Sequence, residues 1–256
     1  MSAGSTRSVS PDCPSPVRRA VMVQTWADLA YLHFEYDVAD VQRLLPEGLD
    51  VDVFGGSAWV GLIPFSMRGV GLPHLPAVPY LGSFPEINVR TYVTRGGVPG
   101  VWFFSLDVNR LLPAVVARAS YRLPYCWGRA EHRLVGSRLS TSVARRWPAP
   151  PPSGPSAMRT SPHTRIELEV GDPLGTPDEF DVWASARWGL YSRGIGQRLM
   201  YAPVEHPRWA LHCATLVDLD DSLVQTAGLP APRGAPRCLF SPGVPVRIGR
   251  PVRVSW

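Results

Sequence analysis

Lysine is absent from the sequence, although arginine is abundant: all 26 basic residues are arginine. Without a lysine amine, no side chain of this chain can form a Schiff base with a carbonyl substrate. The lysine that a P-loop places against a bound phosphate is missing as well. Composition alone therefore excludes both mechanisms for this chain.

The formal net charge of +5 is the one feature of the composition that points towards nucleic acid. No recognition helix and no aromatic RNA-binding motif accompanies the arginines. We attribute the excess of positive charge to a general use of arginine in place of lysine. We therefore expect no nucleic-acid partner.

Cysteine is scarce, and its four occurrences are far apart in the sequence. None of Cys13, Cys126, Cys213 and Cys238 belongs to a Cys-x-x-Cys pair. Because zinc sites and disulfide frameworks both show recurrent cysteine spacings, we expect neither here. Buried reduced thiols are typical of a cytoplasmic protein, which is the localisation that we predict.

Membrane and export signals are also missing. No stretch of about 18 consecutive apolar residues occurs, so we expect no transmembrane helix and no membrane partner. The segment from Met1 to Arg19 is rich in Ser, Pro and Arg and has no apolar core, unlike a secretory signal. We expect residues 1–20 to form a disordered tail, with an organelle-targeting peptide as the alternative.

Three familiar catalytic or cofactor motifs are absent or incomplete. No Gly-x-Ser-x-Gly nucleophile motif occurs, and Gly194-Ile-Gly196 lacks the third glycine of a dinucleotide-binding loop. His33, Glu35 and Asp37 resemble a metal-binding cluster. Only His33 and Glu35 would share a strand face, however, and Asp37 is placed to cap a helix. We expect no metal and no cofactor.

What the sequence does contain is roughly ten short segments with the residues and spacing of β-strands. Short helices are predicted over 38–45, 110–119, 176–188 and 222–227. Strands and helices do not alternate regularly, which argues against a doubly wound fold. We predict a mainly β (α+β) fold, a curved antiparallel β-barrel or sheet with a few short helices at its ends, forming one domain over residues 21–256.

The most informative stretch is 84–107, which is predicted to form two strands around a Gly/Pro turn. Side chains alternate across a strand, so Glu86, Asn88, Arg90 and Tyr92 share one face. Apolar residues occupy most of the other face. The polar face is either a solvated surface with an ion pair between Glu86 and Arg90, or the polar wall of a cavity.

Aromatic neighbours favour the cavity. Phe84 and Tyr92 bracket the two charged residues, and Trp102 lies in the partner strand. In such surroundings burial would raise the pKa of Glu86 while the Arg90 charge would lower it; the residues alone leave the net direction open. A second candidate, His206, either lines a pocket or stands in a His-Pro turn between strands.

Four segments resemble the YqjF-like family of domains of unknown function, and the similarity extends from about residue 20 to residue 250. They are Ala58-Trp-Val-Gly-Leu-Ile-Pro-Phe65, Phe84-Pro-Glu-Ile-Asn-Val-Arg-Thr-Tyr-Val93, residues 97–107 and Phe240-Ser-Pro-Gly-Val. That family is similar to the acetoacetate-decarboxylase-like superfamily. The resemblance implies a curved antiparallel barrel around a small-molecule cavity.

The resemblance also implies roles for individual residues. In the decarboxylases a strand glutamate lines the pocket, and Glu86 stands in the matching motif. Their catalytic lysine would fall near Tyr121 to Tyr125, where this chain has Arg122 and no lysine. An arginine is always protonated and a poor nucleophile, although it can hold a carboxylate. We therefore do not expect decarboxylation through an imine.

We predict an uncharacterised small-molecule pocket protein that acts on a carbonyl or carboxylate compound by acid–base chemistry, with Glu86 as the catalytic group. The predicted substrate-binding residues are Arg90, Arg122, Asn88, Tyr92, Trp102 and His206. A non-catalytic ligand-binding module on the same barrel is the alternative, and a scaffold with a filled barrel is a third hypothesis. Whether the chain is an enzyme, and whether it forms a homo-oligomer, stay open.

Overall fold

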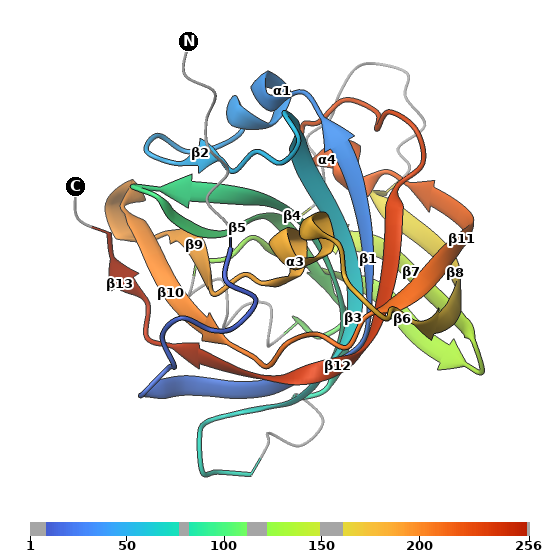
Figure 1. The fold of residues 1–256 in the computed structure, drawn as a ribbon, viewed down its shortest axis with the longest axis horizontal. Coiled ribbons are helices and arrows are strands. Elements are labelled where there is room, and N and C mark those ends of the chain that lie inside the picture. The colour runs from blue at the N-terminus through green and yellow to red at the C-terminus, as the bar shows by residue number, and fades with distance from the viewer. Residues whose placement is uncertain (1–8, 77–81, 112–121, 149–160, 255–256) are drawn as a thin grey trace.

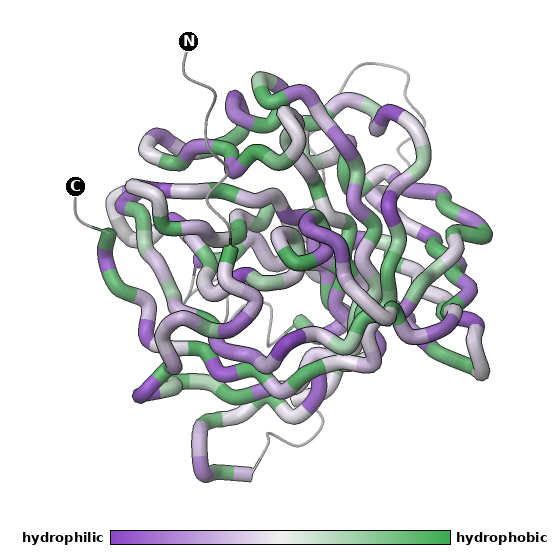
Figure 2. Tube along the Cα trace, viewed as in Figure 1, coloured by the Kyte–Doolittle hydropathy of each residue, from purple (hydrophilic) through white to green (hydrophobic). Residues whose placement is uncertain are grey.

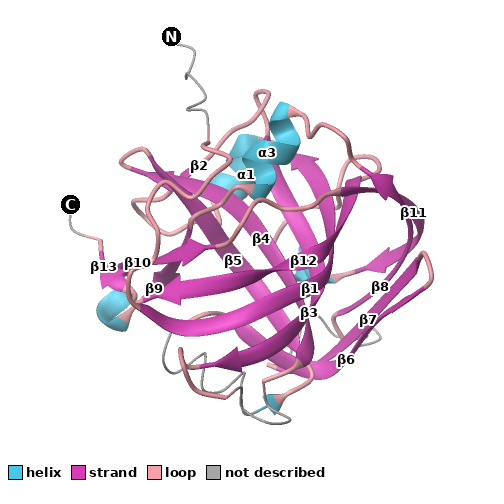
Figure 3. Cartoon of the chain, turned by 60° about the horizontal axis from the view of Figure 1, so that its bottom comes forward, coloured by secondary structure: helices cyan, strands magenta, loops and turns pink. Residues whose placement is uncertain are grey.

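The computed structural model describes residues 9–76, 82–111, 122–148 and 161–254, and β-strands dominate it (Figures 1 and 3). The strands are β1 (Ala20–Tyr36), β2 (Asp50–Val51), β3 (Ala58–Gly71), β4 (Phe84–Arg95), β5 (Val98–Val108), β6 (Tyr125–Val135), β7 (Arg138–Trp147), β8 (His163–Pro173), β9 (Gly189–Arg193), β10 (Leu199–Glu205), β11 (His212–Asp221), β12 (Arg237–Gly249) and β13 (Val252–Arg253). The helical elements are α1 (Val38–Gln42), α3 (Glu179–Ser185), α4 (Leu223–Thr226) and the 3-10 helix η1 (Ile195–Gln197).

The strands form one connected sheet that closes on itself twice. The pairings of β10 with β12 and of β4 with β5 close a first ring made of β12, β1, β3, β4, β5, β9 and β10. A second ring runs from β5 through β6, β7, β8, β11, β12, β1 and β3 back to β4. In Figure 1 the strands that belong only to the second ring, β6, β7, β8 and β11, lie on the right. The predicted barrel with few short helices is confirmed.

Most strand pairs are antiparallel, as predicted. β5 is the exception, because it pairs in parallel with both β6 and β9. Parallel neighbours need long crossover connections, and these bring segments that are distant in sequence next to β5. The position of β5 at the junction of the two rings therefore determines which distant side chains reach β4.

The wall that the two rings share is buried on both faces. On β4, Ile87 and Val89 belong to the apolar core of the second ring, together with Leu168 and Phe240. Tyr92, from the alternate face, belongs to the core of the first ring. Figure 2 accordingly shows hydrophobic and hydrophilic residues intermingled along the strands, without long runs of either kind. The polar face of β4 is thus directed into a ring interior.

Helix α3 covers one end of the first ring, as Figures 1 and 3 show. Asp178 caps it, because its side chain accepts from the Asp181 amide while the Asp181 side chain accepts from the Asp178 amide. The cap lies two residues beyond the predicted Thr176, and the helix ends at Ser185 rather than near residue 188. Phe180 and Trp183 are buried in the first ring's core.

The other predicted helices are shorter than expected. α1 ends at Gln42 and α4 at Thr226. Most of the helix predicted over 110–119 lies outside the described residues. In the described part of the chain, no helix is long and apolar enough to cross a membrane.

Part of the predicted N-terminal tail is packed onto the barrel. Val17 is buried, and its amide donates to a Glu205 carboxylate oxygen at 2.6 Å. The Trp188 indole donates to the Ser10 carbonyl at 2.9 Å, and Arg208 forms a two-pronged ion pair with Asp12. These contacts satisfy the backbone of a segment whose composition alone predicted disorder; residues 1–8 lie outside the described part.

Candidate functional site

The polar face of β4 borders a small cavity inside the first ring. The cavity measures about 50 Å³ and is lined from β4 by Glu86, Asn88 and Arg90. The apolar residues on its walls come from β1, β3, β5, β9 and β12 and from the segment before β6. They are Trp26, Leu29, Phe65, Met67, Phe103, Leu106, Leu123, Leu190 and Ile248. Small-molecule sites are usually lined by apolar side chains with a few polar groups among them, as this cavity is.

Glu86 is 2 % exposed and accepts a hydrogen bond from the Tyr125 hydroxyl, 3.1 Å from Oε2. The pKa of Glu86 is raised to about 8, chiefly by burial and also by the nearby negative charge of Asp107. Hydrogen bonds from Tyr125 and Asn88 act in the opposite direction but do not outweigh burial. Around neutral pH this carboxyl therefore exists in both its protonated and its ionised form.

Arg90 lines the same cavity, but it is not paired with Glu86. It is 7 % exposed and, among the described residues, forms no ion pair with a carboxylate. Instead Nη2 donates to the Tyr92 hydroxyl at 3.3 Å, and the guanidinium lies over the rings of Tyr31 and Tyr92. The surface ion pair considered from the sequence is thus not formed.

Two polar atoms of cavity-lining residues have no hydrogen-bond partner in the described part of the protein. They are Arg90 Nε, a donor, and Asn88 Oδ1, an acceptor. A buried polar group without a partner costs roughly 1–3 kcal/mol. Because the donor and the acceptor belong to neighbouring residues on one strand face, a single small polar molecule in the cavity could satisfy both.

Behind Arg90 lies a hydrogen-bonded group that sequence reasoning missed. The Tyr92 hydroxyl and His33 Nε2 are 2.5 Å apart, and Tyr92 is fully buried. Burial lowers the pKa of His33 well below its ordinary value, and the Arg90 charge lowers it further, so the imidazole is neutral. Arg187 packs over the Tyr92 ring at 4.6 Å and forms an ion pair with Asp52. Tyr92 and His33 thereby orient Arg90 without lining the cavity themselves.

His33 had been considered only as part of a metal-binding cluster with Glu35 and Asp37. The structure separates the three residues. His33 is buried, whereas Glu35 accepts a hydrogen bond from Ser57 and Asp37 forms an ion pair with Arg233 at the surface. No group of three His, Cys, Asp or Glu side chains in the described residues is arranged to hold a metal ion.

Besides Tyr92, three more of the predicted binding residues lie outside the cavity lining. Arg122 is exposed, has a left-handed backbone (φ 54°), and lines a surface depression together with Trp102. Neither residue borders the Glu86 cavity. Trp102 is next to Phe103 on β5, and because side chains alternate along a strand, only Phe103 faces the cavity. His206 is buried and stacks on Trp188, with ring centroids 4.4 Å apart, and it too is outside the cavity lining.

Tyr125 is a candidate functional residue that the sequence analysis did not name, although it considered the segment that contains Tyr125. It ends the segment in which the resemblance would place a lysine, and we had considered Arg122 as the replacement. The parallel pairing of β6 with β5 instead brings Tyr125 opposite Leu106 and directs its hydroxyl to Glu86. Tyr125 is buried in this position, and burial raises the pKa of its phenol well above the ordinary value, so it acts as a donor.

Comparison with known proteins shows what this arrangement is similar to. Residues 23–245 match the family DUF2071, described as "Uncharacterized conserved protein (COG2071)". The uncharacterized protein YqjF of Bacillus subtilis (strain 168) is 30% identical over 216 residues, covering 84% of this chain and 85% of that protein.

Solved structures with the same fold include two enzymes of low sequence identity. The enduracididine biosynthesis enzyme MppR, complexed with pyruvate, has a TM-score of 0.63 and 15% identity over 94% of this chain and 93% of its own. Acetoacetate decarboxylase from Legionella pneumophila has a TM-score of 0.64 and 12% identity over 100% and 98% of the two chains. The solved structures show the same barrel fold. Because the family match covers most of its length, the chain belongs to the DUF2071 family.

Proposed function

We propose that this chain binds a compact carboxylate-bearing compound in the Glu86 cavity and acts on it by acid–base chemistry. One observation carries the proposal: a buried arginine without a carboxylate partner in the described residues and a carboxyl group with a pKa of about 8 border the same cavity. A buried unpaired charge is costly, and an anionic ligand would offset that cost.

Each cavity residue has a role in this proposal. Arg90 binds the carboxylate of the ligand, for which a guanidinium is well suited. Asn88 offers its unpaired Oδ1 to a hydroxyl or an enol on the ligand. Glu86 gives a proton to the ligand, or takes one from it, because a group with a pKa near the working pH does both efficiently. Tyr125 donates to Glu86 and stabilises its ionised form.

The size of the cavity limits the ligand. Ordinary ligand pockets measure about 300–1,000 Å³, whereas this one measures about 50 Å³. Only a molecule of a few non-hydrogen atoms fits without movement of the walls. A 2-keto acid of about three carbons has the required charge and size. The structure of MppR with bound pyruvate shows that a related barrel holds such a compound.

The missing lysine favours a second function, a ligand-binding module without catalysis. No imine can form on a side chain of this chain, so the chemistry by which the decarboxylase relatives act is not available to it. In that case Arg90 and Asn88 would hold the ligand as proposed, and Glu86 would contribute a hydrogen bond only.

A matched set of variants separates these functions. We expect pyruvate to bind the wild type in calorimetric titration, to bind Arg90→Gln at least about tenfold more weakly, and to bind Arg122→Gln unchanged. Arg122 is the control because it is an arginine outside the cavity. Equal binding by all three proteins would refute the assignment of Arg90.

Catalysis is tested with Glu86→Gln, assayed against a panel of 2-keto acids and enolisable ketones. We expect turnover to fall by about 10²-fold or more in a variant whose circular dichroism spectrum is unchanged. Turnover equal to that of the wild type would exclude Glu86 as the catalytic group. Binding without turnover in the wild type would identify the chain as a binding module.

A further inference from the structure

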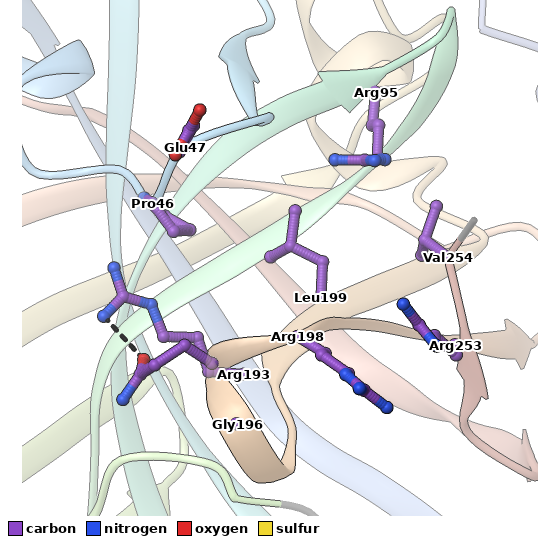
Figure 4. A pocket seen from close by; sticks show the side chains of 10 residues that line it. Pro46, Glu47, Arg95, Arg193, Gly196, Arg198, Leu199, Arg253 and Val254 are labelled. Atoms are coloured by element: carbon purple, nitrogen blue, oxygen red, sulfur yellow. Dashed lines mark hydrogen bonds between the residues drawn. The ribbon is translucent and has the colours of Figure 1, made fainter. Parts of the chain in front are cut away.

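We propose that a second, surface pocket binds a compact anion carrying several phosphoryl groups. This pocket measures about 430 Å³ and lies where the ends of β4, β9, β10 and β13 meet (Figure 4). Four of its lining residues are arginines, namely Arg95, Arg193, Arg198 and Arg253. It is distinct from the Glu86 cavity, with which it shares no lining residue.

The four arginines come from different segments and are grouped by the fold. Figure 4 shows them arranged around the buried Leu199. One carboxylate, Glu47, lines the pocket with them. Arg193, Arg198 and Arg253 form no ion pair within the described residues. Like charges held close together repel, and an anion bound between them would relieve that repulsion.

The turn between β9 and β10 connects two of these arginines, Arg193 and Arg198. Gly196 and Gln197 in η1 both have left-handed backbones, with φ of 68° and 61°. For a residue other than glycine this conformation is uncommon and costs roughly 1 kcal/mol or more. Arg193 Nη1 donates to Gln197 Oε1 at 3.1 Å and ties the turn to the end of β9. Arg198 follows directly after the turn and borders the same pocket.

The chemistry of the lining fits an anion with several phosphoryl groups better than it fits nucleic acid. Guanidinium groups bind phosphate oxygens in pairs, so several arginines together match an anion with several phosphoryl groups. The volume of the pocket lies within the usual range for small-molecule sites. No aromatic side chain is among the described residues that line it, so it offers no ring on which a nucleobase could stack.

Tripolyphosphate is the probe for this proposal, measured by isothermal titration calorimetry at about 0.15 M salt. We expect it to bind the wild type and to bind the double variant Arg198→Gln, Arg253→Gln at least about tenfold more weakly. The control is Arg129→Gln, Arg133→Gln on β6, which removes the same charge from two exposed residues elsewhere. Its affinity should stay within about twofold of the wild type.

Three results would overturn the proposal. They are no binding of tripolyphosphate by the wild type, equal weakening in the two double variants, and tighter binding of a single-stranded oligonucleotide that depends on the same two arginines. The first would mean that the pocket binds no polyphosphate, the second that net charge and not the pocket attracts anions, and the third that the pocket is a nucleic-acid groove. Glu86→Gln should bind tripolyphosphate like the wild type, since the two sites are separate.

Discussion

At the scale of single residues, the Glu86 carboxyl lies in surroundings that disfavour its charge. It is buried among apolar walls, and Asp107 adds a nearby negative charge that is itself paired with Arg145 at 2.7 Å. Arg90 is on the same strand face, yet it contributes no resolved effect on the pKa of Glu86. The competition between burial and Arg90 that the sequence left open is therefore decided by burial.

The raised pKa of Glu86 predicts a stability that falls as pH rises. The pKa of this group changes from an ordinary value of 4.5 to about 8 on folding. Between these values the unfolded chain has released the proton and the folded chain has kept it. The contribution to the free energy of unfolding is therefore fully present below about pH 4.5 and is lost as pH rises through about 8, by at most about 1.4 kcal/mol per pH unit.

Urea unfolding of the wild type and of Glu86→Gln between about pH 5 and pH 9 measures this contribution. The glutamine variant cannot ionise at this position, so the other titrating groups cancel in the comparison. We expect the stability of the wild type relative to the variant to decrease by at least about 1 kcal/mol from pH 6 to pH 8. A difference that is constant across this range would contradict the raised pKa.

At the scale of elements, α3 begins at a cap on the surface and packs against the residues behind the cavity. Its Trp183 ring lies 4.6 Å from the Tyr92 ring and 4.3 Å from the Arg187 guanidinium. Arg237 on β12 adds an ion pair to the capping residue Asp178 at 2.7 Å. The seven residues of α3 are too few to form a stable helix alone, so packing and capping must stabilise it.

Asp178→Ala should therefore lower the free energy of unfolding by about 1 kcal/mol, within a range of roughly 0.5–2 kcal/mol for a lost cap. Chemical denaturation of the purified protein gives this value. Glu179→Ala is the matched control, because Glu179 is an exposed acid in the first turn of the same helix but not the cap. If both substitutions had the same effect, the cap would not be what stabilises α3.

At the scale of the whole molecule, the shared wall separates two interiors with different roles. Apolar side chains, including Ile87, Val89 and Leu168, form the core of the second ring. The first ring combines an apolar core with the Glu86 cavity. A single strand, β4, thus contributes packing to one ring and polar chemistry to the other, because its alternate side chains point to opposite sides.

This division predicts that stability and ligand binding can be changed separately on β4. Ile87→Ala should destabilise the fold by roughly 2–5 kcal/mol, the usual cost of truncating a fully buried isoleucine, while leaving the pyruvate affinity of the folded protein unchanged. Denaturation and calorimetric titration test the two parts. The exposed Val98 provides a control, since Val98→Ala should change stability by less than about 0.5 kcal/mol. A large loss of pyruvate affinity in Ile87→Ala would contradict the separation of the two faces.

Several features of the fold followed from local pattern. Alternation placed Glu86, Asn88 and Arg90 on one face because the side-chain period of a strand is fixed by its backbone. Short apolar segments without regular helices between them predicted the barrel. The end points of α1 and α3 were less predictable, since they depend on which residues pack against the sheet.

The membership of the site was only partly predictable. His33 and Tyr125 come from β1 and β6, and nothing in their local sequence indicates that they reach β4. Arg122 precedes Tyr125 by three residues but lies at the surface. The resemblance indicated the segment that ends at Tyr125, whereas the direction of each side chain depended on the register with β5.

By itself, the sequence determined that this chain has no lysine for an imine, that its strands alternate, and that an acid, an amide and a base share one face of β4. Only the tertiary structure decided that this face is directed into a ring, that Arg90 is left without a carboxylate partner in the described residues, and that burial raises the pKa of Glu86 to about 8. Alternation is a property of one strand, whereas burial and convergence depend on the pairing of strands that are far apart in the sequence.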